Sequence, residues 1–429
     1  MQRYLYKTCI VNEVFLKWIQ PSIAVTLFIK NNQIKIIEME EVDEFLYPII
    51  VDVAKKCNVK INGKLYFFKM IGIFKGHFYI ILSFLYLLWK LMLIPHSNQI
   101  ETENKKIAII RTPAARKKMA FLNDVNVKLE SLKDKNTVYN CFSKKQRIWW
   151  VLKAWKSSYR EIREYQTVLN ESLGSYSALD AFVYYSKRVV HTFLYSYMIT
   201  KYFSRNKGAT YYTGNNLDRF AVIEENISKK YNIKTVCIPH GLEYGFKLPL
   251  GFTCNEFYTT SMQAAKHLNL LYNTNKFIFN KVIAKKMFAV SFKAKKQKRI
   301  VFFTEPREVN VNIKIIDELL PLLEKEKIVL NLKLHPKDQK KNYLKYKNRI
   351  CILEDFNEAI TNNICFSRKS TTILEALYNN SKAAAILINQ KDRFTFNTFP
   401  SLQENEINVY NNITGLFEWV KKHINESSG

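Results

Sequence analysis

Four short segments place reactive or phosphate-binding side chains directly after apolar runs that are typical of buried strands. The first is Pro239–His240–Gly241, which follows the apolar run 234–238. An imidazole beside a glycine at a strand end is accessible and can work as a general base near neutral pH, so His240 is a candidate for that role. Gly241 and Glu243 are candidate contacts to an acceptor substrate. A loop histidine on its own is more often incidental, so this interpretation depends on the other three segments.

The second segment is His335–Pro336–Lys337, at the end of the apolar run 328–335. The proline stops the strand, and the imidazole and the ammonium group are then placed to bind phosphate oxygens through charge-assisted hydrogen bonds. All three residues are candidates for donor binding. A turn proline beside an incidental histidine explains the pattern equally well.

The third segment opens a predicted helix with hydroxyl side chains. Ser370, Thr371 and Thr372 precede the helix, and Arg368 adds positive charge. Hydroxyls and backbone N–H groups at a helix N-terminus form a cradle for phosphate, so these residues are candidate phosphate ligands. An ordinary helix cap would use the same residues.

The fourth segment, 304–307, contains Glu305 and follows the apolar run 299–303. Its position suits contact with a nucleotide base or ribose, and Glu305 is therefore a candidate for donor binding.

Alternating strands and helices must position these four segments. Strands are expected at 106–112, 209–214, 234–238 and 256–261, and again at 299–305, 328–335, 350–354, 363–367 and 382–389, with helices between them. Repeated strand–helix–strand units predict parallel sheets, which bind ligands beyond the carboxyl ends of their strands. The series restarts at residue 299. The sequence therefore predicts an α/β protein with two Rossmann-like domains, 1–285 and 286–429, facing a central cleft.

The first 206 residues are less regular and form the helical and apolar part of the first domain. Apolar runs at 22–29 and 33–39 flank Asn31–Asn32, which predicts a β-hairpin. Residues 145–206 are rich in helix formers and aromatic side chains, which indicates a group of helices. The apolar segment 77–94 is barely long enough to cross a bilayer, so a buried helix, a helix lying in the membrane interface and a short span are all considered.

The net charge of the chain indicates which kinds of binding partner are expected. Lys and Arg number 66 against 37 Asp and Glu, a net charge of +29. This balance indicates a polyanionic partner, or else only a lysine-rich coding bias. The basic residues are dispersed and no RNA-binding signature accompanies them, which favours an anionic membrane surface over nucleic acid.

Cysteine usage and metal motifs indicate a metal-independent protein of a reducing compartment. The 7 cysteines are scattered without a Cys-x-x-Cys pair. No Asp-x-Asp or His-Glu-x-x-His motif occurs, so no metal and no other cofactor is expected. No signal peptide is recognised at the start, which favours a cytoplasmic protein on the inner face of the membrane.

Taken in order, the His-Gly loop, Leu-His-Pro and the Ser/Thr cluster resemble a group of bacterial surface-polysaccharide transferases of the GT-B fold. The resemblance covers about 210–390. It includes sialyltransferases, CMP-Kdo-using capsule transferases and CDP-glycerol glycerophosphotransferases. In the sialyltransferases the His-Pro and Ser/Thr motifs bind CMP, which implies that role for His335, Pro336 and Ser370–Thr372. Where sialyltransferases carry an acidic catalytic base, this chain has His240, as the glycerophosphotransferases do.

The leading hypothesis is therefore a transferase that moves sialic acid, or a related ulosonic acid, from a CMP-sugar to a lipid-linked or surface glycan, with His240 as the base. A CMP-Kdo transferase or a CDP-glycerol glycerophosphotransferase is the alternative. A non-catalytic protein that binds membranes or nucleic acid through its charge is the third hypothesis.

Overall fold

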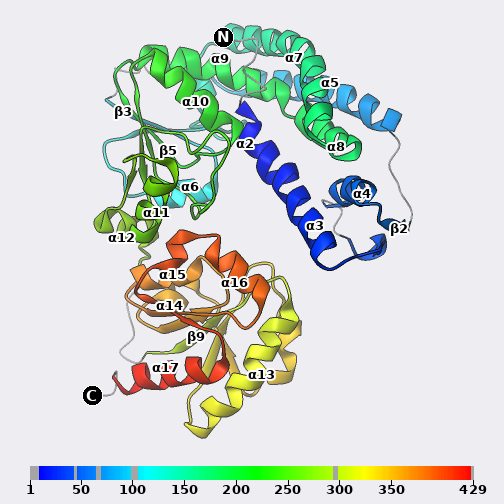
Figure 1. The fold of residues 1–429 in the computed structure, drawn as a ribbon. Coiled ribbons are helices and arrows are strands. Elements are labelled where there is room, and N and C mark those ends of the chain that lie inside the picture. Colours follow the sequence, from blue (N-terminus) through cyan, green and yellow to red (C-terminus); the bar gives the residue numbers. More distant parts are fainter. Residues whose placement is uncertain (1–8, 43–45, 64–68, 98–104, 293–297, 427–429) are drawn as a thin grey trace. The chain divides into compact units, whose positions relative to one another are not determined.

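The computed structural model describes residues 9–42, 46–63, 69–97, 105–292 and 298–426. The chain divides into two compact units (Figure 1). Unit 1 comprises 1–113, 123–237 and 248–255, and unit 2 comprises 114–122, 238–247 and 256–429. Each of the two six-stranded parallel sheets is built from strands on one side of residue 285, but 256–285 belong to unit 2, so the domains 1–285 and 286–429 stay a prediction.

The C-terminal sheet has the strand order of a Rossmann fold. Its strands are β9 (Ile300–Phe303), β10 (Leu330–Lys333), β11 (Ile350–Ile352), β12 (Ile364–Ser367), β13 (Lys382–Ile386) and β14 (Ile407–Tyr410). They run in the order β11-β10-β9-β12-β13-β14, and every pair is parallel. Numbered along the chain, this is the order 3-2-1-4-5-6 of doubly wound dinucleotide-binding sheets. The direction of winding reverses between β9 and β12, where such sheets bind their ligands.

Alternating side chains of β9 build a core on each face of this sheet. Ile300 and Phe302 pack with α13 (Val309–Lys325) and α17 (Ile413–Asn425), whereas Val301 and Phe303 pack with α14 (Phe356–Ile360) and α15 (Thr372–Tyr378). In Figure 1, α13 and α17 accordingly lie on one side of the sheet and α14 and α15 on the other. Burial on both faces explains why the strands are continuous apolar runs.

The N-terminal sheet also has six strands. It contains β3 (Lys106–Ile110), β4 (Asn126–Leu129), β5 (Thr210–Thr213), β6 (Lys234–Cys237), β7 (Glu256–Tyr258) and β8 (Phe277–Ile278), in the order β4-β3-β5-β6-β7-β8. Its helices include α6 (Pro113–Met119), α10 (Arg219–Lys230), α11 (Met262–Tyr272) and α12 (Lys281–Phe288). Ser261 caps α11 by accepting a hydrogen bond from the Ala264 N–H, as its residue type predicts. The α/β class with two Rossmann-like sheets is thus confirmed.

Unit 1 also contains a helical layer. It comprises α2 (Val11–Val14), a π-helical turn (Phe15–Ile19), α3 (Gln20–Asn31), α4 (Tyr47–Lys56), α5 (Lys69–Leu93), α7 (Lys144–Ser172), α8 (Ser175–Ser186) and α9 (Val189–Arg205). The helices predicted within 145–206 are therefore confirmed. Their inward faces share one apolar core with β3 and β5.

The predicted β-hairpin at 22–39 is wrong. Residues 20–31 form α3, and the Asn32 side-chain amide donates to the Phe28 carbonyl at the C-terminus of this helix. The Asn-Asn pair therefore terminates a helix instead of turning a hairpin. Only Ile36–Glu38 (β1) is a strand in this region, and it pairs in parallel with Lys60–Asn62 (β2).

Of the three alternatives considered for 77–94, the buried core helix does not fit the structure. This segment lies in α5, of which Gly72–Leu93 is long and apolar enough to cross a membrane, yet only 22% of that stretch is buried. One side of α5 packs on the helical layer and the other is exposed, because the segment is apolar on both sides whereas its neighbours cover only one.

Candidate functional site

Three of the four predicted segments meet at the carboxyl edge of the C-terminal sheet. Phe303, the last residue of β9, lies opposite Lys333 of β10 and Ser367 of β12. The loops that follow β9, β10 and β12 therefore begin at the same level of the sheet. The loops after β9 and β12 flank the switch point. The segments 304–307, 335–337 and 368–372 belong to these loops.

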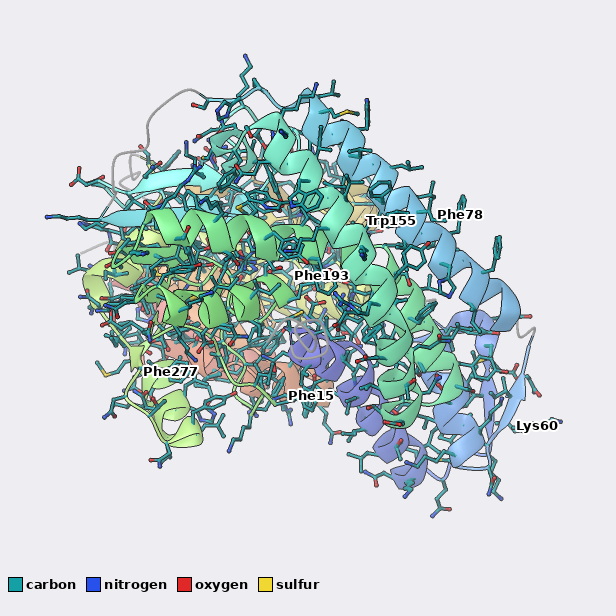
Figure 2. All side chains as sticks on the ribbon, turned by 90° about the horizontal axis from the view of Figure 1, so that it is seen from above. Phe15, Lys60, Phe78, Trp155, Phe193 and Phe277 are labelled. Atoms are coloured by element: carbon teal, nitrogen blue, oxygen red, sulfur yellow. The ribbon has the colours of Figure 1, made fainter. Side chains whose placement is uncertain are left out.

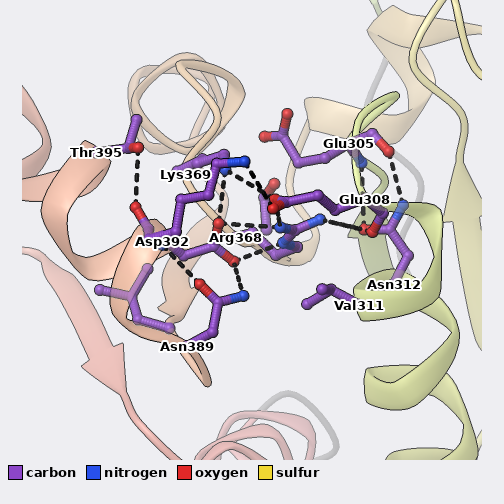
Figure 3. Close-up of polar contacts among 12 residues, drawn as sticks. Glu305, Glu308, Val311, Asn312, Arg368, Lys369, Asn389, Asp392 and Thr395 are labelled. Carbon is purple, nitrogen blue, oxygen red and sulfur yellow. Dashed lines mark hydrogen bonds and ion pairs between the residues drawn. The ribbon is translucent and has the colours of Figure 1, made fainter. Parts of the chain in front are cut away.

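Arg368 is the structural centre of this edge. Its side chain has no exposed surface, and it grips Asp392, which is also fully buried, with Nε at 2.6 Å and Nη2 at 2.9 Å from the two carboxylate oxygens (Figure 3). Nη2 also donates to Glu308 Oε2 at 2.8 Å, and Nη1 donates to the Glu308 carbonyl at 3.2 Å. A fork of this kind fixes two loops against each other. The predicted role of Arg368, to add positive charge beside a bound phosphate, is not supported, because its guanidinium is fully buried and already paired with Asp392 and Glu308.

A cluster of alternating charges extends from Arg368 toward solvent. Lys369 Nζ lies 2.7 Å from Asp392 Oδ1, and Lys391 Nζ donates to Glu308 Oε1 at 2.8 Å. The hydrogen bond from Lys391, joined by the one from Arg368, lowers the pKa of Glu308 to about 2. Burial opposes ionisation of Asp392, but Arg368 and Lys369 still hold its pKa below the usual range. Both carboxylates are therefore ionised at neutral pH.

Glu305 lies immediately after β9, and its carboxylate is not fully satisfied. Oε1 is buried and has no hydrogen-bond partner among the residues that the structure describes. Burial raises the pKa of the Glu305 carboxyl, although Arg368 and Lys369 pull it down. The Glu305 carbonyl accepts from Asn312 Nδ2 at 2.7 Å, which fixes the backbone on this loop. A buried acceptor without a hydrogen bond lowers the stability of the fold, so Glu305 is a candidate to accept a hydrogen bond from a ligand.

His335 follows β10 and is oriented by the turn that Pro336 starts. Its Nδ1 accepts from the Lys337 backbone N–H at 3.1 Å, so a neutral imidazole carries its proton on Nε2. Burial, together with the charge of Lys337, lowers the pKa of His335. The His335 N–H also donates to Thr304 Oγ1 at 3.3 Å, which joins the loops after β9 and β10. His335 is thus a neutral hydrogen-bond donor, while Lys337 is exposed.

The hydroxyl cluster is held mainly by itself. Ser370 Oγ lies 2.8 Å from Thr372 Oγ1 and accepts from the Thr372 N–H at 3.3 Å. Thr371 is exposed, and the helix that follows, α15, has 7 residues. The N-cap residue of α15 is Thr371, whose side chain makes no capping hydrogen bond, and phosphate binding by Ser370, Thr371 and Thr372 stays a prediction.

His240 is partly buried in the loop after β6, and this loop belongs to unit 2 together with the C-terminal sheet. Glu243 secures the loop: its Oε1 accepts from the Thr260 N–H at 2.7 Å, and its Oε2 accepts from the hydroxyls of Thr260 and Ser401. The loop is further held by the Gly245 N–H, which donates to the Thr398 carbonyl at 2.8 Å. Gly241 is exposed, and a Cβ there would meet nothing within 4 Å.

Glu243 itself is 1% exposed, and burial raises the pKa of its carboxyl despite the hydroxyls of Ser401 and Thr260. Its predicted contact with an acceptor is not supported, because both carboxylate oxygens are already engaged inside the protein. Glu243 instead positions the loop that carries His240.

Several residues of this site were not predicted from the sequence. They are Glu308, Asn312, Lys391 and Asp392. A signal for one of them existed, because Asn389-x-x-Asp392 is a capping pattern at the start of α16 (Gln390–Asn397), and Asn389 Oδ1 accepts from the Asp392 N–H at 2.8 Å. That pattern predicts the helix start but not the pairing with Arg368.

A second polar cluster, also unpredicted, lies at the carboxyl end of β3 in unit 1. Arg111 Nη2 lies 2.9 Å from Asp218, and Arg111 also pairs with the buried Glu224. Burial raises the pKa of Glu224 to about 7, against the opposing charge of Arg111. Tyr195 donates to the same carboxylate. This cluster connects β3 to α10; Arg111 and Glu224 are buried within it, whereas Asp218 is partly exposed.

Within the described part of the chain, no group of three or more His, Cys, Asp or Glu side chains could hold a metal ion. Cavities of about 820 and 530 Å³ lie beside the amino ends of the C-terminal strands, near Lys382 and Ile300 respectively. Because parallel sheets bind ligands at the opposite edge, the carboxyl-edge cluster is the stronger candidate for the site.

No family model matches the sequence, and no curated protein sequence matches it. Among solved structures, the chain is similar to Staphylococcus aureus MnaA in complex with UDP, with 11% identity and a TM-score of 0.40 over 75% of this chain and 88% of that one. It is also similar to a Listeria monocytogenes protein assigned as a UDP-N-acetylglucosamine 2-epimerase, with 10% identity and a TM-score of 0.41 over 75% and 89% of the two chains. Since both scores are low, the fold assignment depends on the strand order and parallel pairing of the two sheets.

Proposed function

We propose that this protein is a glycosyltransferase that binds a nucleotide-sugar donor at the carboxyl edge of the C-terminal sheet. The observation that carries the proposal is the Glu305 carboxylate, whose Oε1 is buried beside the switch point without a partner in the described structure. In Rossmann sheets a carboxylate beside the nucleotide accepts hydrogen bonds from ribose hydroxyls. A ribose or base donor would satisfy Glu305 in the same way.

The groups around Glu305 suit the phosphate of the same ligand. His335 donates from Nε2, and Lys337 supplies an exposed positive charge on the same loop. Neither group needs a metal ion to offset phosphate charge. Lys369, in contrast, is already paired with Asp392, so it contributes mainly to the rigidity of the site.

The donor class that we propose is a CMP-sugar, with sialic acid or a related ulosonic acid as the transferred group. This choice is supported by the resemblance of His335–Pro336 and Ser370–Thr372 to the CMP-binding motifs of bacterial sialyltransferases. CMP-Kdo and CDP-glycerol are the alternative donors. Both solved structures named above concern UDP or a UDP-sugar, so UDP-sugars belong in the same test.

In the proposed reaction, His240 removes the proton from an acceptor hydroxyl, and that oxygen attacks the anomeric carbon of the donor sugar. The bond between the anomeric carbon and the phosphate oxygen breaks, and CMP leaves with the bonding electrons. His335 and Lys337 stabilise the charge that develops on the departing phosphate. The acceptor is a lipid-linked or surface glycan.

The donor class is tested by the change in melting temperature with CMP, UDP and GDP. We expect the largest increase with CMP, and Glu305→Gln should weaken CMP binding about tenfold or more, since hydrogen bonds to a charged acceptor contribute about 1.5–3 kcal/mol. Stabilisation by UDP alone would redirect the assignment to UDP-sugars, and no stabilisation by any nucleotide would contradict the site.

The roles of the two histidines are separated by a pair of variants. His240→Ala should abolish transfer and leave CMP affinity nearly unchanged, whereas His335→Ala should weaken CMP binding. Release of CMP is followed with CMP-sialic acid, CMP-Kdo and CDP-glycerol in turn. Loss of CMP binding in His240→Ala, or unchanged affinity in His335→Ala, would refute these roles. If no donor is consumed while vesicles or RNA bind with steep salt dependence, the protein is a non-catalytic binder.

A further inference from the structure

The outer side of α5 is a continuous apolar surface. Its central residues are Phe74, Phe78, Leu82, Leu85, Trp89 and Leu93, which we call the α5 outer face. They recur every three or four residues, so they form one stripe along the helix. Their side chains are 75%, 49%, 42%, 52%, 51% and 62% exposed in the same order. Figure 2 shows Phe78 projecting away from the neighbouring helices, on the side opposite to Trp155.

The inner side of α5 is fixed to the helical layer of unit 1. Ile80, Leu87 and Leu91 are at most 2% exposed. At Gly76 an added Cβ would come within 2.2 Å of the Phe182 ring, and at Gly72 within 2.8 Å of Leu179. The two glycines therefore let α5 lie directly against α8, a contact that any larger side chain would push apart.

The charged side chains of α5 itself are all positive. Residues 53–100 contain no Asp or Glu, whereas Lys75 and Lys90 lie on α5 itself. Lys90 Nζ lies 4.3 Å from the centre of the Trp89 ring, so an ammonium group and an indole ring lie next to each other on α5. Lysines can extend from an apolar surface to anionic headgroups, and Trp and Tyr are enriched at the same depth of a bilayer.

We propose that the α5 outer face is a membrane-docking surface, on which α5 lies in the plane of an anionic bilayer with its outer face among the acyl chains. An apolar stripe with lysines and Trp beside it is typical of interfacial helices. A transmembrane orientation is disfavoured, because it would strip Ile80, Leu87 and Leu91 from their contacts with the helical layer. This proposal does not depend on the glycosyltransferase assignment, but it would bring the protein to a membrane of the kind that carries lipid-linked acceptors.

The test is co-sedimentation of the full-length protein with vesicles. One set contains phosphatidylcholine and phosphatidylglycerol, and the other contains phosphatidylcholine alone. We expect binding to the anionic set, weakened by added salt. The double variant Leu85→Gln/Trp89→Gln should lower the partition coefficient about tenfold or more. The matched control is Leu270→Gln/Phe394→Gln, which changes side chains that are 85% and 76% exposed on α11 and α16.

Each alternative gives a distinct result. Equal binding of both double variants, or no binding of the unaltered protein, would overturn the proposal. Protein that stays in membranes after alkaline carbonate extraction would show a transmembrane helix instead. A concentration-dependent dimer that Leu85→Gln/Trp89→Gln abolishes, without vesicle binding, would assign the surface to a second copy of the chain. Circular dichroism of the variants checks that these exposed substitutions leave the fold intact.

Discussion

Removal of the Asp392 carboxylate tests whether the Arg368 clamp holds the carboxyl edge of the C-terminal sheet together. In Asp392→Ala, the Arg368 donors Nε and Nη2 lose acceptors at 2.6 and 2.9 Å, and Lys369 loses one at 2.7 Å. Arg368 and Asp392 are both fully buried, so the variant leaves a buried guanidinium without its main carboxylate partner. Breaking a buried pair by removing one partner costs about 3–5 kcal/mol. This is a large part of the stability of a typical domain, which is about 5–15 kcal/mol.

Amide hydrogen exchange measures this effect within the part of the chain concerned, because it reports local opening. Asp392→Ala should speed amide exchange in peptides covering 364–396. The expected factor follows from the loss of about 3–5 kcal/mol, with about tenfold for each 1.4 kcal/mol. Glu324→Ala is the control, because it removes an equally well-formed pair with Arg349 that is exposed, and it should change exchange little. Arg368→Met/Asp392→Leu should recover part of the loss, since it leaves no buried charge of that pair unpaired. If Asp392→Ala changes exchange no more than Glu324→Ala, the clamp is not structural and the reasoning fails.

Four further variants test other parts of the molecule. Glu305→Gln should leave the melting temperature unchanged or raise it, because it removes a buried charge, and it should weaken the binding of CMP. A lower melting temperature with unchanged CMP affinity would contradict this. The pKa of Glu308 falls from its usual 4.5 to about 2. The ionised carboxylate therefore contributes fully to folding stability above pH 4.5, and this contribution is lost as the pH falls toward 2. Glu308→Gln should make the free energy of unfolding less dependent on pH between these values. Glu243→Gln should lower the rate of transfer more than the affinity for CMP, and equal losses in both would argue against positioning of His240. Gly76→Ala should destabilise unit 1 by about 1–3 kcal/mol through overpacking in thermal unfolding, unless the neighbouring ring yields.

The strands around the site were predictable from the sequence because they are buried on both faces. Continuous runs such as 300–303 and 364–367 have no polar alternation, and their spacing fits strand–helix–strand units. The missed strands of the two six-stranded sheets are β4, β8 and β14. β8 has only 2 residues, and β14 is an edge strand with two exposed positions out of 4, so neither produces a long apolar run.

The partners of each site residue were less predictable than its position. The sequence places Arg368 after a strand, but its acceptors lie 60 and 24 residues away, at Glu308 and Asp392. Local patterns do not encode such pairings, so Arg368 and Glu243 were expected to face a substrate when tertiary contacts in fact enclose them. At 22–39 the error was different, since Asn31–Asn32 suits both a hairpin turn and the end of a helix.

The glycine contacts of α5 also have a consequence for how the chain is made. α5 ends at Leu93, whereas α8, which holds Leu179 and Phe182, begins at Ser175. During synthesis the inner side of α5 therefore leaves the ribosome well before the surface that covers it. Throughout this interval the nascent chain presents the stretch Gly72–Leu93, which contains an 18-residue window of mean hydropathy 1.5. We therefore expect folding of unit 1 to require that this segment stay out of a membrane until α8 emerges and covers it.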